Sequence, residues 1–193
     1  PGSTTVRIAH PFVTPTITSS VSTVTVTTPS LTMAAIPVVG AGLQVSASGT
    51  LNGPQHGGIS IVVRSADPTR ALVALNASAV ASDSIVITLA NGVNTFSYVV
   101  AGVEGSTGTA AIAASVARFT GTQQTATVVA PRLDISGLAT SRAALGADDP
   151  FQVRIGIPNA GNTALSATQA VRAGAAPLVV TIASGTPAVG TLV

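Results

Sequence analysis

Apolar and polar residues alternate with a period of two along most of this chain. The stretches Ser22–Thr28, Ser84–Leu89 and Thr95–Val100 alternate strictly, and residues 43–48, 59–65, 109–117 and 151–157 follow a similar pattern. Successive side chains of a β-strand point to opposite faces, so this alternation predicts half-buried strands. Segments rich in Gly, Asn, Asp and Pro separate these strands and predict turns at 52–58, 66–68, 90–94 and 102–108. A spacing of roughly ten residues between strands predicts antiparallel β-sandwiches.

One segment, residues 163–174, does not fit this pattern. Its sequence TALSATQAVRAG has no alternation, and Leu165, Ala170 and Arg172 do not form the apolar face of a helix. We expect a loop or a short helical turn there.

One part of the chain resembles another part 102 residues further along. Residues 23–29 (TVTVTTP) align with 125–131 (TATVVAP), and the apolar positions that follow each proline also correspond. The match continues at growing offsets: Leu43–Val45 aligns with Phe151–Val153 at an offset of 108, and Val63–Pro68 with Ile182–Pro187 at an offset of 119. The second copy therefore carries insertions, mostly between residues 158 and 177. Towards the N-terminus, GST at 2–4 matches GST at 105–107, and we expect both to precede a strand.

These matches predict three regions. Residues 1–28 correspond to the last two strands of one repeat, residues 29–130 to a whole repeat, and residues 131–193 to the first part of a third. Pro29 ends a strand because proline cannot donate to the ladder, and the linker of one or two residues predicts a stiff rod. Neither partial repeat contains a counterpart of residues 74–103, so the two together do not complete a sandwich. We therefore expect a window on a longer array.

Composition narrows the possible functions. Charged residues make up only 7% of the chain, aromatic residues 3%, and there are no cysteines. The eight cationic residues are all arginines and are scattered singly, whereas a nucleic-acid surface needs clustered cations and aromatics, so no nucleic-acid partner is expected. The lack of cysteine excludes disulfides and thiolate metal sites. No apolar run approaches the about 18 residues needed to cross a bilayer, so no membrane insertion is expected.

Two long stretches carry a resemblance to a known family. Residues 42–73 contain strand patterns followed by an S-x-D-P turn. Residues 84–129 contain an aromatic-bearing strand, a G-x-x-G-x-x-x-I-x-A strand and a closing T-x-T-V strand. The first stretch resembles the early strands, and the second stretch the second half, of the bacterial immunoglobulin-like repeat domains of large secreted and cell-surface proteins. The resemblance covers nearly all of 29–130 and fragments of the rest. It implies tandem immunoglobulin-like antiparallel β-sandwiches, an extracellular location, and a role as a spacer, stalk, adhesin shaft or filament material.

The chain offers few residues for metal or ligand binding. His56, in the glycine-rich loop 52–58, is either a ligand contact or a polar turn residue, and the turn is favoured because zinc needs three or four ligands and His10 belongs to another repeat. Asp148 and Asp149 are the only acidic pair, and calcium takes six to eight oxygens, so calcium is disfavoured here although backbone carbonyls could supplement the carboxylates. We expect them to form a turn before a strand.

Phe96 and Tyr98 lie two residues apart and therefore point to the same face of a strand. They form either a carbohydrate-stacking platform or part of the core with Val100. The core is favoured, with Ser97 and Val99 facing outward and the Tyr98 hydroxyl bonded to a polar partner at the rim.

No enzyme is expected. Ser60, His56 and Asp67 can be combined into a triad on paper, but any serine-rich chain offers such sets, and recognition needs geometry. Glu104 is the only glutamate, and no nucleophile elbow, zinc-binding helix or phosphate-binding loop is present. No catalytic residue, metal or cofactor is assigned.

The sequence therefore favours a structural, self-associating segment of a long extracellular bacterial protein. One alternative is an adhesin or carbohydrate-binding module that uses loop 52–58 and the Phe96/Tyr98 strand to bind surface glycans or host cell-surface proteins. Another is a filament subunit completed by donor-strand exchange. The absence of counterparts to residues 74–103 argues against this last alternative unless the sandwich is a reduced one.

Overall fold

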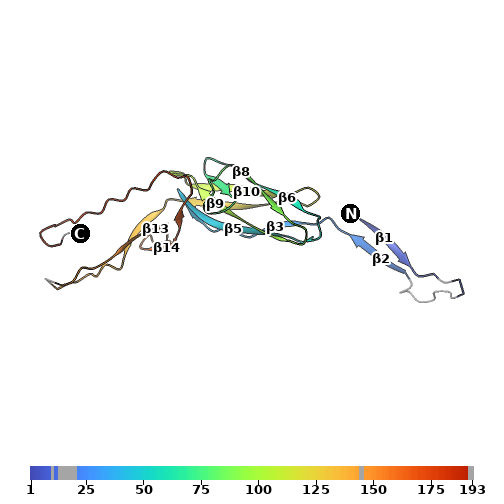
Figure 1. Ribbon diagram of the computed structural model, residues 1–193, viewed down its shortest axis with the longest axis horizontal. Coiled ribbons are helices and arrows are strands. Elements are labelled where there is room, and N and C mark those ends of the chain that lie inside the picture. Colours follow the sequence, from blue (N-terminus) through green and yellow to red (C-terminus); the bar gives the residue numbers. More distant parts are fainter. Residues whose placement is uncertain (10, 13–20, 144–145, 191–193) are drawn as a thin grey trace.

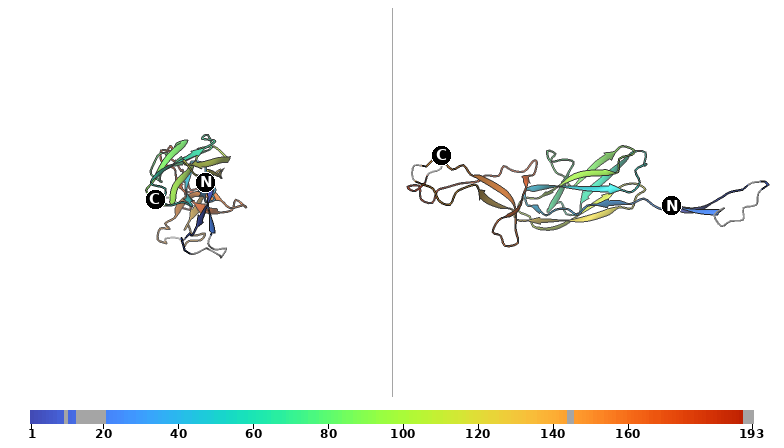
Figure 2. Two further views of the ribbon diagram at one scale, coloured as in Figure 1. Left: turned by 90° about the vertical axis from the view of Figure 1, so that its right-hand side faces the viewer. Right: turned by 90° about the horizontal axis from the view of Figure 1, so that it is seen from below.

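The computed structural model describes residues 1–9, 11–12, 21–143 and 146–190, and these form β-strands joined by turns and loops, with no helix. The molecule is elongated, and three groups of strands follow one another along its long axis (Figure 1). Seen end-on, it is narrow (Figure 2). The expected all-β class is confirmed, with several antiparallel sheets.

The middle of the molecule is a unit of two sheets, hereafter the two-sheet unit. Its strands are β3 (Leu31–Met33), β4 (Val39–Gly40), β5 (Leu43–Leu51), β6 (Ile59–Ser65), β7 (Ala71–Ala74), β8 (Ser84–Leu89), β9 (Thr95–Gly102), β10 (Gly108–Ser115) and β11 (Thr122–Val129). One sheet has the order β4-β11-β10-β6-β8. The other contains β5-β9-β7, and β3 pairs with the outer edge of β5. All these pairings are antiparallel except β4 with β11.

Both sheets contribute to one hydrophobic core. Ile61, Ile112 and Val128 from the first sheet and Tyr98 and Val100 from the second are almost fully buried in it. The predicted alternation explains this burial, because every second residue of each strand points inward. The core is built mainly from Val, Ile, Leu and Ala, as the composition requires.

Burial of Val99 was not expected. Val99 points away from the core, as predicted, but it is only 5% exposed, so the outer face of β9 is covered at this position. Gln44 lies opposite Ala101 in the sheet, so its side chain is on the same face as Val99. Gln44 Nε2 donates to the carbonyl oxygen of Ala77 at 3.0 Å, which places the connection after β7 over this outer face.

At one end of the molecule, β1 (Gly2–Arg7) and β2 (Val21–Val26) form an antiparallel hairpin, the head hairpin. All twelve of its strand residues are exposed. Gly2 lies opposite Val26, just as Gly108 lies opposite Val128 in the β10–β11 hairpin. By this register β1 matches β10 at an offset of 106 (108 − 2) and β2 matches β11 at 102 (128 − 26).

The expected match of the two GST tripeptides is therefore wrong. Gly2–Thr4 lie inside β1, whereas residues 105–107 lie in the turn before β10. A match of three small residues does not decide which residues of two strands correspond. The apolar residues on one face of the strand decide this. The offset of 106 aligns Val6 with Ile112 and Ile8 with Ala114, which are on the inward face of β10.

At the other end, β12 (Arg132–Ser136), β13 (Gln152–Pro158) and β14 (Leu165–Thr168) form a small antiparallel sheet, the end sheet. The short strand β15 (Ala170–Val171) then pairs with β5 of the two-sheet unit. Residues 163–174 thus contain two strands, and the expected loop or helical turn is wrong. The edges of β13 and β5 supply partners for this segment, and no local pattern reveals such distant partners.

The match of Leu43–Val45 with Phe151–Val153 does not extend to strand pairing. In the two-sheet unit Leu31 lies opposite Leu51. The offset of 102 makes Leu133 the counterpart of Leu31, and the offset of 108 makes residue 159 the counterpart of Leu51, so residue 159 should lie opposite Leu133. The structure places Ile155 there, four residues away. A shift by an even number keeps each side chain on its face, so the alternation is satisfied by either register.

Candidate functional site

The loop 52–58 is fixed to the neighbouring turn at 90–94. His56 Nε2 donates to the carbonyl oxygen of Val93 at 2.9 Å, and its Nδ1 accepts from the backbone N–H of Gly58 at 3.1 Å. Asn91 adds a bond to Gly57 N. Nε2 of His56 thus joins the two turns and Nδ1 braces its own loop, the polar turn role that the sequence favours.

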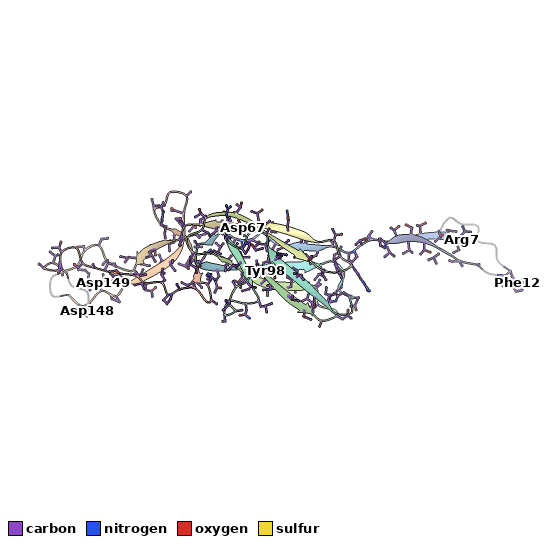
Figure 3. The ribbon with its side chains drawn as sticks, turned by 90° about the horizontal axis from the view of Figure 1, so that it is seen from above. Arg7, Phe12, Asp67, Tyr98, Asp148 and Asp149 are labelled. Atoms are coloured by element: carbon purple, nitrogen blue, oxygen red, sulfur yellow. The ribbon has the colours of Figure 1, made fainter. Side chains whose placement is uncertain are left out.

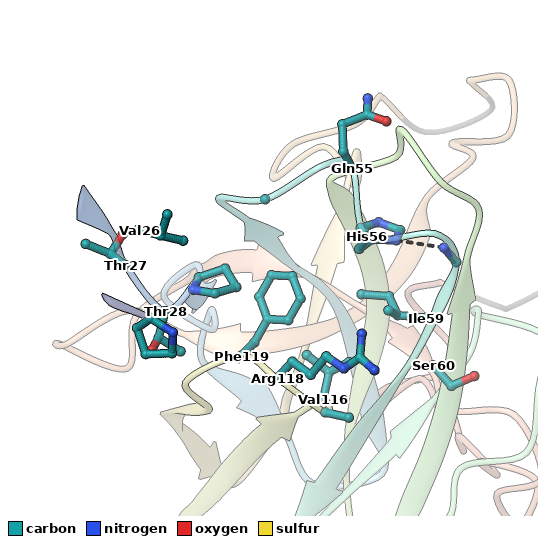
Figure 4. Close-up of a pocket in the computed structure, with 15 residues that line it drawn as sticks. Val26, Thr27, Thr28, Gln55, His56, Ile59, Ser60, Val116, Arg118 and Phe119 are labelled. Carbon is teal, nitrogen blue, oxygen red and sulfur yellow. Dashed lines mark hydrogen bonds between the residues drawn. The ribbon is translucent and has the colours of Figure 1, made fainter. Parts of the chain in front are cut away.

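His56 also lines an open hollow of about 1170 Å³ between the head hairpin and the two-sheet unit (Figure 4). The strand end and linker 26–29 form one side, and loop residues and the turn 116–119 form the other. Arg118, on this turn, has a φ of 70°, in the left-handed region that non-glycine residues rarely adopt. The hollow therefore presents an exposed guanidinium and the half-buried ring of Phe119 beside a polar loop.

Phe96 and Tyr98 do not reach this hollow. Their rings are stacked, with centroids 6.1 Å apart, and are 4% and 1% exposed, so they belong to the core, as favoured, and cannot form a stacking platform. Figure 3 shows Tyr98 in the middle of the molecule. Its hydroxyl has no hydrogen-bond partner within the described ranges, so the expected polar partner at the rim is wrong. Burial raises the pKa of Tyr98 to about 12, because the phenolate would lose its hydration.

The other candidate residues lie apart. Asp149 Oδ2 accepts from the backbone N–H of Ala139 at 2.7 Å and so closes a loop, while Asp148 is exposed at the far end of the molecule (Figure 3). His56 precedes β6 and Asp67 follows it, so the combination of Ser60, His56 and Asp67 is spread over the length of a strand. In the described part of the chain no three His, Asp or Glu side chains gather as metal ligands, and His10 lies outside that part. Nor do the described residues contain a helix suited to crossing a membrane.

Asp67 instead organises the S-x-D-P turn. Its Oδ1 accepts from the hydroxyl of Thr69 at 2.6 Å and from the backbone N–H of Thr69 at 3.1 Å, and its Oδ2 lies 3.2 Å from Arg70 Nε. The bonds from Thr69, helped by Arg70, lower the pKa of Asp67. Its role is to shape the turn between β6 and β7.

Sequence reasoning missed the residues that join the two-sheet unit to the end sheet. Gln169 accepts from Gly40 N at 2.8 Å through Oε1 and donates to the carbonyl oxygen of Val38 at 2.7 Å through Nε2. Arg172 donates from Nε and Nη2 to the two carboxylate oxygens of Glu104, both at 2.7 Å. We call Gln169 and Arg172, with β15 between them, the clip. The bonds from Arg172 are the largest cause of the lowered pKa of Glu104.

The clip lies within residues 158–177, where the sequence comparison predicts insertions, and that prediction was the only signal that could have pointed to it. Arg172 also donates its backbone N–H to Gly42 O at 3.0 Å. Pro131, Leu43 and Leu178 line a small hollow at the same junction. The junction is thus held by strand pairing, side-chain bonds and apolar contact together.

Near the start of the two-sheet unit, β4 runs beside the last strand, β11, in the same direction. Val39 and Gly40 of β4 pair in parallel with Val128 and Val129 of β11, and Ser30 forms a parallel bridge with Thr120. Since the head hairpin and the end sheet lie at opposite ends of the unit (Figure 1), the chain enters at one end and leaves at the other.

No model of a known protein family matches the chain, and no curated protein matches it in sequence.

Proposed function

We propose that this chain is a load-bearing, non-catalytic segment of a long extracellular bacterial protein built from immunoglobulin-like repeats. The parallel pairing of β4 with β11 carries this proposal. A pull along the long axis shears β4 against β11, so that the hydrogen bonds between them are loaded together. Ala41 N to Val129 O at 2.9 Å and Leu31 N to Thr120 O at 3.1 Å share that load.

Three further observations support a stiff shaft. The two-sheet unit has its own core, which a folded spacer needs. The clip fixes the unit to the end sheet, so the junction does not swivel freely. The shared register of the β1–β2 and β10–β11 hairpins is what tandem repeats of one sandwich would produce.

Single-molecule force spectroscopy on the 193-residue chain, held at its two ends, tests the proposal. We expect one dominant force peak, followed by a gain in length on the order of 300 Å as residues 29–130 extend. Ala41→Pro removes the bond to Val129 O and should lower the peak force. Extension without a distinct peak would contradict a load-bearing role.

The hollow beside His56 favours a second candidate function, capture of surface glycans or of a host surface protein. Arg118 supplies the polar contact and Phe119 the aromatic one. Arg118→Gly is the sharpest test, because glycine adopts the φ of 70° without strain and so removes the guanidinium while keeping the turn. On a glycan array, binding that this variant abolishes would support ligand capture, and an array without specific binding would exclude glycan capture.

A further inference from the structure

The head hairpin has an open edge and an exposed apolar face. In the described residues β1 pairs with β2 and with no other strand, whereas its counterpart β10 lies between β11 and β6. Val6 and Ile8 are 55% and 68% exposed, while their counterparts Ile112 and Ala114 are almost fully buried. A lone two-stranded hairpin is marginally stable in water, so this edge and face favour a third strand.

A matching strand is present near the other end of the chain. Residues 177–184 (PLVVTIAS) align with β6 at an offset of 119 and alternate like it, but no strand is assigned to them within the described ranges. Val180 and Ile182, the counterparts of buried Ile61 and Val63, are 37% and 44% exposed beside β12. The chain therefore carries a counterpart of β10 at one end and a counterpart of β6 at the other.

The β6–β10 pairing inside the two-sheet unit supplies a register for these two segments. Within the unit, Ser65, Arg64 and Val63 lie opposite Ile112, Ala113 and Ala114. The offsets of 119 and 106 convert these into Ser184 opposite Val6, Ala183 opposite Arg7 and Ile182 opposite Ile8.

This register keeps the chemistry of each of these three pairs. The inward pairs remain apolar or serine, and Ser184 reproduces Ser65, which is buried in the unit. At the outward pair the unit has Arg64 opposite Ala113, and the new pair has Arg7 opposite Ala183, so arginine and alanine exchange strands. A long side chain still faces a small one, and two arginines never meet across the ladder.

We propose that two copies of this chain associate head to tail, with residues 178–184 of one copy adding a strand to β1 of the next. The two segments lie at opposite ends of the elongated molecule (Figures 1 and 3), which disfavours pairing within one copy. Because the two surfaces differ, each copy in a pair of 193-residue chains keeps one of them free, and further copies add to these in an open, head-to-tail series. This inference goes beyond the shaft proposal, which needs no contact between copies.

Cysteine trapping tests the register, since the chain has no cysteine of its own. Arg7→Cys combined with Ala183→Cys should give a ladder of disulfide-linked dimers and larger species under mild oxidation, reversed by a thiol. The matched control, Arg7→Cys with Val179→Cys, uses another exposed residue on the same face. It lies four residues away, about 13 Å along a strand, which is beyond disulfide reach. Equal ladders from both variants would overturn the register.

Sedimentation of the cysteine-free chain tests the association itself. We expect mass to rise with concentration, Val6→Asp to reduce the association constant at least tenfold, and Thr5→Asp, on the opposite face of β1, to leave it nearly unchanged. Both substitutions lie in the exposed hairpin, outside the core of the two-sheet unit. A chain that stays monomeric at every concentration overturns this inference, and the force peak then decides the shaft proposal separately.

Discussion

Arg172 and Glu104 lie 68 residues apart and form a two-bond ion pair, with both nitrogen–oxygen distances at 2.7 Å. Arg172 comes from the segment between the end sheet and the C-terminus, and Glu104 from the turn between β9 and β10 of the two-sheet unit. The Arg172 side chain is only 14% exposed, but that of Glu104 is 43% exposed, so solvent screens the pair in part and its contribution is that of a surface ion pair. It ties the segment after the end sheet to the two-sheet unit.

Glu104→Gln should therefore loosen the clip. The amide keeps the shape of the carboxylate but loses its charge and one acceptor, so the segment around Arg172 opens more often. We expect trypsin to cleave after Arg172 about two to five times faster, which corresponds to about 0.5–1 kcal/mol. Asp134→Asn is the matched control, because Asp134 forms a similar two-bond pair with Arg154 inside the end sheet. If both variants accelerate cleavage after Arg172 equally, the clip does not depend on Glu104.

Tyr98→Phe should stabilise the two-sheet unit. The Tyr98 hydroxyl is buried and finds no partner in the described part of the chain, so it carries a desolvation cost that phenylalanine lacks. We expect the free energy of unfolding to rise by about 1 kcal/mol, measured by chemical denaturation. Tyr98→Ala is the contrasting variant, with a loss of about 3–5 kcal/mol from the cavity it leaves. A clear loss of stability in Tyr98→Phe would show that the hydroxyl is bonded.

Stability should also fall in alkali. The pKa of Tyr98 is raised from 10.0 to about 12 in the folded protein, so folding favours the protonated form. The contribution of Tyr98 to the free energy of unfolding is complete below pH 10. It is lost as the pH rises from 10 to 12, so the free energy of unfolding decreases by an amount on the order of 2 kcal/mol. Tyr98 is the only tyrosine, so tyrosinate absorbance reports this one group. Tyr98→Phe should remove this pH dependence, and titration near pH 10 would contradict burial of the hydroxyl.

Gly49→Ala should destabilise the same unit. Gly49 lies opposite Phe96, and a Cβ at this position would sit 2.3 Å from the Phe96 ring and 2.7 Å from the carbonyl oxygen of Thr32. The ring and backbone must move, at a cost of about 1–3 kcal/mol. Gly2→Ala is the matched control, since nothing lies within 4 Å of its Cβ position. Thermal melts of the two variants compare them, and an unchanged melting temperature for Gly49→Ala would contradict the close packing on Phe96.

Much of the fold follows from local pattern. The alternation of Ser84–Leu89 predicts β8, and that of residues 59–65 predicts β6, each with the bounds that the structure has. The same-face rule places Phe96 and Tyr98 together in the core. The candidate site was harder to predict, because His56 was found by its residue type, but its bonds to Val93 and Gly58 depend on how two turns meet.

The sequence by itself determined the all-β class, most strand positions and the inward face of strands such as β9, because side chains alternate across any strand whatever it pairs with. Only the tertiary structure decided the register of β1, the burial of Val99, the strands at 165–171 and the pairing of Arg172 with Glu104. Each of these depends on which distant edge or loop comes alongside. A period of two is equally satisfied by registers that differ by two or four residues, so partners distant in sequence fix the choice.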